Sequence, residues 1–143
     1  MNLKLLPSWS KTDEIYSLNN SQGMENVDNL ICPSGEVVSV FFVDEEPKVA
    51  MHMFDRMIRD YKITTPNLRL LIAGKLKIKE YFVPIYIIRE KLSKKAFVNI
   101  FFEMDKKAYA LIFALKKFER SITKNVKENP VLLYALKLLE ANL

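Results

Sequence analysis

Three strand-like segments follow one another between residues 75 and 104, and the short connections between them constrain the fold more than any other feature. Apolar residues and lysines alternate over 75–82, which is the period of a strand with one solvated face. Residues 83–90 and 96–104 are rich in β-branched and aromatic side chains, as strands are. Because short connections favour antiparallel pairing, the sequence predicts an antiparallel sheet.

The remaining apolar segments predict one more strand and several helices. Residues 36–43 have the composition of a strand buried on both faces, and an acidic, proline-containing start at 44–47 begins a helix. Asp105 is expected to cap a helix that runs to residue 122, and Asn129-Pro130 to open the last helix. For residues 66–74 a short helix is preferred, with a strand as the alternative.

Together these elements predict a single α+β domain, in which an antiparallel sheet packs against several helices. A chain of 143 residues is the usual size of one domain. Residues 1–34 are rich in Asn, Ser and Asp, so we expect an N-terminal arm there and the compact domain over 35–143.

Cysteine content and hydropathy indicate the compartment. Cys32 is the only cysteine, so neither an intrachain disulfide nor a four-ligand Cys/His zinc site can form. The first residues are too short an apolar run for a signal peptide, and no stretch approaches the roughly 20 apolar residues of a membrane span. We therefore expect a cytoplasmic protein, peripheral to the inner face of a membrane.

Motifs that would support catalysis are weak in this sequence. His52 and Cys32 could form a nucleophile pair, but no nucleophile-elbow context surrounds either residue. Acidic residues near lysines, at 46–48 and 103–106, are a weak indication of a metal-dependent nuclease. Phosphate-binding loops need more than the three glycines present. The sequence predicts a non-enzyme without cofactor, metal or small-molecule substrate.

Charge is divided along the chain. Residues 1–61 carry five basic and ten acidic side chains, whereas residues 62–143 carry seventeen and seven. A basic cluster attracts an anionic membrane, at about 1 kcal/mol per lysine, and RNA is a second candidate partner. The predicted membrane- and phosphate-binding residues are Arg69, Lys75, Lys77, Lys79, Lys91, Lys94, Lys95, Lys106 and Lys107.

An apolar cluster in the predicted arm indicates self-association. Leu5, Leu6, Pro7 and Trp9 precede some twenty-five mostly polar residues, a tether long enough to reach a second copy. Attraction between the acidic and basic halves of two copies would support the same homo-oligomer. The alternative is that this cluster folds back onto its own core.

Residues 97–105, together with Glu80-Tyr81-Phe82, resemble the central strands of the matrix proteins of bornaviruses, nyamiviruses and related nonsegmented negative-strand RNA viruses. The resemblance covers about 25 residues and includes no proline-rich late-budding motif. It implies a non-enzymatic virion protein that oligomerises beneath a membrane and links lipid to ribonucleoprotein. No binding residue can be transferred from it.

The leading functional hypothesis is therefore a self-associating scaffold of viral matrix type, which binds anionic membrane through its lysines. A regulatory or inhibitory protein-binding module, of the immunity or host-interaction type, is the alternative. A metal-dependent nuclease is the third hypothesis.

Overall fold

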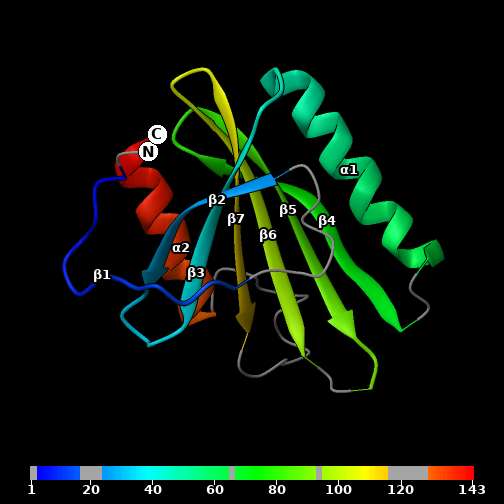
Figure 1. Cartoon of the computed structure of the whole chain (residues 1–143), viewed down its shortest axis with the longest axis horizontal. Coiled ribbons are helices and arrows are strands. Elements are labelled where there is room, and N and C mark those ends of the chain that lie inside the picture. The colour runs from blue at the N-terminus through cyan, green and yellow to red at the C-terminus, as the bar shows by residue number, and fades with distance from the viewer. Residues whose placement is uncertain (1–2, 17–23, 65–66, 93–94, 116–128) are drawn as a thin grey trace.

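The computed structural model describes residues 3–16, 24–64, 67–92, 95–115 and 129–143, of which 61–64 and 72 are described by their backbone alone. These residues form one seven-stranded sheet and two helices (Figure 1). The elements in chain order are β1 Ser10–Lys11, β2 Met24–Ile31, β3 Val37–Val43, α1 Pro47–Thr64, β4 Leu68–Ile78, β5 Tyr81–Glu90, β6 Ala96–Met104, β7 Lys107–Leu115 and α2 Pro130–Asn142.

The strands lie in the order β1-β2-β3-β7-β6-β5-β4, and every neighbouring pair is antiparallel. After β3 the chain crosses through α1 to the far edge of the sheet. Strands β4 to β7 then return as a meander, which places β7 beside β3. The antiparallel pairing predicted for residues 75–104 is confirmed, and β4 is an edge strand.

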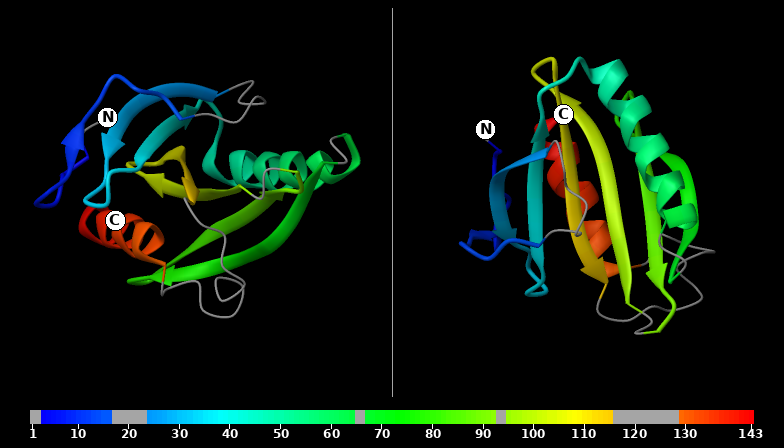
Figure 2. Two further views of the ribbon diagram at one scale, coloured as in Figure 1. Left: turned by 90° about the horizontal axis from the view of Figure 1, so that it is seen from below. Right: turned by 45° about the vertical axis from the view of Figure 1, so that its right-hand side comes forward.

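The central strands are buried on both faces. Alternate residues of β7 belong to two separate apolar clusters, one formed with α2 and the other with α1. The residues on the α2 face are Tyr109, Leu111 and Phe113, and those on the α1 face are Ala108, Ala110 and Ile112. Because a strand of this kind needs a layer on each side, the helices lie on opposite faces of the sheet (Figure 2).

Each helix has a local reason to begin where it does. Pro47 opens α1, as the acidic and proline-containing start predicted. The Asn129 side chain caps α2 by accepting hydrogen bonds from the backbone N–H groups of Val131 and Leu132, at 3.1 and 3.3 Å. On the other face, the Phe54 ring of α1 stacks on Phe101 of β6 with ring centroids 3.8 Å apart.

The short helix preferred for residues 66–74 is wrong, and the strand alternative is correct. Strand β4 pairs with β5 from Leu68 onward, with a register shift between Leu70 and Ile72. Pairing with the long apolar β5 therefore outweighs the helix-start signal before it. The strand expected over 75–82 is divided by a turn at Lys79-Glu80, where Lys79 has a φ of 54°.

The helix predicted from Asp105 to residue 122 is also wrong, because Lys107–Leu115 forms β7. Asp105 and Lys106 both have positive φ angles, 52° and 63°, and connect β6 to β7 as a two-residue hairpin loop. A strand buried on both faces lacks the alternation that identifies a half-buried strand, so its apolar run also fits a helix. The rest of the predicted helix, 116–128, lies outside the described residues.

These differences change the fold class. The α+β prediction, with several helices packed on the sheet, is contradicted: the structure is mostly antiparallel sheet, all-β in character, with two helices among the described residues. The segment predicted as an arm also contributes to the sheet. Strand β2 pairs with β3 along its length, and β1 pairs with Leu30 and Ile31 of β2.

The β6–β7 loop gives a test of this correction. Replacing Lys106 by Gly should raise the free energy of unfolding by about 1 kcal/mol, because glycine adopts positive φ without steric cost. Lys107→Gly, one residue later in β7, should lower it by about 0.5–1 kcal/mol. Urea denaturation measures both values. In a helix both substitutions would destabilise, so a less stable Lys106→Gly variant contradicts the hairpin.

Candidate functional site

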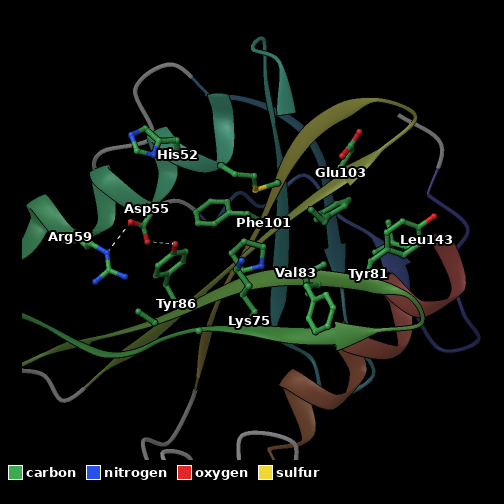
Figure 3. A pocket seen from close by; sticks show the side chains of 16 residues that line it. His52, Asp55, Arg59, Lys75, Tyr81, Val83, Tyr86, Phe101, Glu103 and Leu143 are labelled. Carbon is green, nitrogen blue, oxygen red and sulfur yellow. Dashed lines mark hydrogen bonds and ion pairs between the residues drawn. The ribbon is translucent and has the colours of Figure 1, made fainter. Parts of the chain in front are cut away.

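A groove of about 610 Å³ lies between α1 and the β4–β5 hairpin (Figure 3). It opens where β5 separates from β6, since these strands pair only from Ile85 to Arg89 on the β5 side. Pro84 comes just before that ladder and has no N–H to extend it. Phe101 and Phe102 of β6 therefore line the groove beside Val83 and Pro84 of β5.

Helix α1 contributes the polar wall of the groove. His52, Asp55 and Arg59 are spaced by three and four residues and so share one face of the helix. Asp55 accepts a hydrogen bond from Arg59 Nε at 2.9 Å and another from the Tyr86 hydroxyl of β5 at 2.5 Å (Figure 3). The second bond joins α1 to the sheet.

The hydrogen bonds among Asp55, Arg59 and Tyr86 determine the protonation states of Asp55 and Tyr86. Hydrogen bonds from Arg59 and then from Tyr86 hold the pKa of Asp55 below its usual range. Burial, and then the bond to Asp55, raise the pKa of Tyr86. At neutral pH Asp55 is therefore ionised and Tyr86 protonated, and neither is poised to exchange a proton as a general acid or base would.

The β4–β5 hairpin forms the other side of the groove and exposes two aromatic rings. Tyr81 is 55% exposed and Phe82 is 65% exposed. Phe82 is the cross-strand partner of Lys77, and Pro84 of Lys75, so both lysines lie on the same sheet face as Phe82. At the turn, Lys79 Nζ donates to the Leu143 carbonyl oxygen at 3.2 Å. We name Lys75, Lys77, Lys79, Tyr81 and Phe82 the hairpin patch.

The structure divides the predicted basic residues between the two ends of the sheet. Arg69, Lys91 and Lys95 lie at one end, where the Lys91 N–H donates to the Asn67 carbonyl. Lys79 lies at the other end, about 33 Å away along β4 by strand geometry. Lys106 and Lys107 are at that second end, in the β6–β7 hairpin. Lys94 lies outside the described residues.

The predicted self-association residues pack against their own chain. Trp9 is buried in the cluster around α2, and Leu5 and Leu6 pack against that cluster, whereas Pro7 is exposed. Within this chain the apolar cluster around Trp9 thus folds back onto its own core, which is the alternative given above. No described helix combines the length and the apolar character needed to cross a membrane.

Sequence reasoning missed the two most informative parts of this site. The alternating pattern assigned Phe82 to a single strand over 75–82, and Lys79-Glu80 contains none of the residues typical of a turn, so no local signal placed Tyr81 and Phe82 at a hairpin tip. The Asp55–Tyr86 bond joins residues 31 positions apart, and no local pattern indicates such a contact.

Comparison with known proteins gives no family: no family model matches the chain, and no curated protein matches it.

The Asp55–Tyr86 bond predicts a pH-dependent stability. Tyr86→Phe should raise the pKa of Asp55 toward its usual value and lower the free energy of unfolding at pH 7 by about 1 kcal/mol. Because the folded pKa is depressed, the stabilisation is present above the unfolded pKa and is lost as pH falls through the folded one. The difference between wild type and variant should therefore shrink below about pH 4.

Carboxyl NMR titration and urea denaturation measure these two effects. Tyr109→Phe is the matched control, because Tyr109 belongs to the α2-facing cluster. An unchanged Asp55 pKa in Tyr86→Phe would contradict the assigned bond.

Proposed function

We propose that this chain is a non-enzymatic scaffold that attaches to anionic membrane through the hairpin patch. The observation that carries the proposal is the tip of one hairpin that carries three lysines and two exposed aromatic rings, Phe82 on the sheet face of Lys75 and Lys77 and Tyr81 on the opposite face. Aromatic rings favour the membrane–water interface, and lysines favour an anionic surface. An exposed apolar patch rimmed by polar residues commonly marks a protein or membrane interaction site.

The magnitudes indicate weak attachment by one copy. Three lysines contribute about 3 kcal/mol near an anionic surface, and partial burial of the two rings adds about 2 kcal/mol. A total of about 5 kcal/mol corresponds to a dissociation constant on the order of 0.2 mM. Several linked copies would bind far more tightly, which is why we propose a self-associating scaffold.

Acidic residues at the same end of the sheet reduce the positive charge of the hairpin patch without cancelling it. Asp44, Glu45 and Glu46 are exposed at the same end of the sheet, just after β3. Four strand spacings separate β3 from β4 in the sheet order, which is about 19 Å along the sheet. This exceeds the Debye length of about 8 Å at physiological salt. Glu80, in the turn itself, and Glu103, which lines the same groove as Lys75, are the nearer opposing charges.

A protein-binding module is the second candidate, and the edge strand favours it. Strand β4 spans 11 residues and pairs on one side with β5. An edge of this length can accept a strand from a partner protein. Lysines on the edge, here Lys75 and Lys77, commonly prevent such pairing, so we place membrane attachment first. RNA is a further polyanion that the same lysines could bind.

Vesicle sedimentation tests the proposal. The Lys75→Glu, Lys77→Glu, Lys79→Glu variant should lose binding to phosphatidylserine vesicles, because it reverses six units of charge beside the rings. Tyr81→Ser with Phe82→Ser should weaken binding at least tenfold, since burial of a large apolar side chain contributes more than 1.4 kcal/mol. Wild-type binding should fall as salt rises.

The matched control reverses the same charge at the opposite end of the sheet, with Arg69→Glu, Lys91→Glu and Lys95→Glu. Melting temperatures confirm that each variant is folded. Retained binding in the folded hairpin variant, together with loss in the control, would move the membrane contact to the end that carries Leu92, which is 85% exposed.

A further inference from the structure

We infer that the groove beside the hairpin patch selects among lipid headgroups. It binds a headgroup that carries both a phosphate and an ammonium group, and among the anionic lipids this is phosphatidylserine. This inference rests on the membrane attachment proposed above. It adds a selectivity that the lysines alone do not provide, since a lysine cluster responds to net charge and not to headgroup structure.

The groove has opposite charges on its two sides, and aromatic rings are among its lining residues. Lys75 lines it from β4 and Glu103 from β6 (Figure 3). Phe82 lines it on the sheet face of Lys75, whereas Tyr81, the partner of Ile78, lines it from the opposite face, beside Leu143. Both charged residues are exposed, and Glu103 has no ion pair within the part of the chain that is described. The separation of β5 from β6 beyond Ile85 creates the space between them.

The phosphate and the ammonium of such a headgroup each have a complementary group in the groove, whereas the carboxylate of phosphatidylserine stays on the solvent side of it. The phosphate suits the Lys75 ammonium, and the headgroup ammonium suits the Glu103 carboxylate and the exposed ring of Phe82, which lies on the same sheet face. Asp55 does not compete for the ammonium, because Arg59 and Tyr86 already donate to its two oxygens. An anionic headgroup without an ammonium group is repelled by the Glu103 carboxylate.

The size and position of the groove fit a lipid headgroup. A volume of about 610 Å³ lies within the range of small-molecule sites, roughly 300–1,000 Å³. The groove is continuous with the hairpin patch, because Lys75, Tyr81 and Phe82 belong to both. A headgroup can therefore enter while its acyl chains stay in the bilayer on which Tyr81 and Phe82 rest.

The experiment compares vesicles that contain equal fractions of phosphatidylserine or phosphatidylglycerol, which have the same net charge. Wild-type protein should prefer phosphatidylserine by up to about fivefold, the size of an exposed ion pair. Glu103→Gln removes a negative charge, so electrostatics alone predicts stronger binding to both lipids. The inference predicts that phosphatidylserine binding falls or stays level while phosphatidylglycerol binding rises, which removes the preference.

Asp105→Asn is the matched control, because it makes the same charge change two residues away, in the β6–β7 loop and outside the groove lining. It should strengthen binding to both lipids equally and keep the preference. Equal binding of wild type to the two lipids, or a preference that survives Glu103→Gln, overturns the groove inference and leaves the attachment intact. Absence of binding to either lipid overturns both.

Discussion

The burial of β6 and β7 on both faces is the constraint on which the rest of this structure depends. A sheet with such central strands must be covered by a layer on each side, and α1 and α2 supply the two layers. On its own face α1 packs above Phe101 and Ala110 through Phe54 and Ala50. Tyr86 and Ile88 of β5 also lie under α1, whereas the tip of the β4–β5 hairpin stays beyond this cover, and the groove lies at the boundary.

Local sequence patterns predict the parts of this fold that depend on local chemistry. The strand over 37–43, the helix that begins at Pro47 and the helix capped by Asn129 all form close to where the sequence places them. Local patterns give the wrong conformation for β4 and β7, where pairing with distant strands decides it. In β7, burial on both faces removes the alternation that would have distinguished a strand from a helix.

In the candidate site too, some features follow from local sequence and others from tertiary structure. The alternating lysines at 75, 77 and 79 were identifiable from the sequence, because their period is that of a strand. Their separation from Arg69, Lys91 and Lys95 depends on strand direction and sheet order, which are tertiary properties. The Asp55–Tyr86 contact and the groove depend in addition on how α1 crosses the sheet.

Attachment through the hairpin patch is the central claim of this account, and amide hydrogen exchange on the unmodified protein tests it most directly. With anionic vesicles present, we expect slower exchange at residues 79–82, and unchanged exchange at Lys91 and Leu92 at the opposite end of the sheet. Contact with the interface would shield the hairpin tip from water. Protection at Lys91 and Leu92 without protection at 79–82, or no protection anywhere while the protein sediments with vesicles, would contradict the claim.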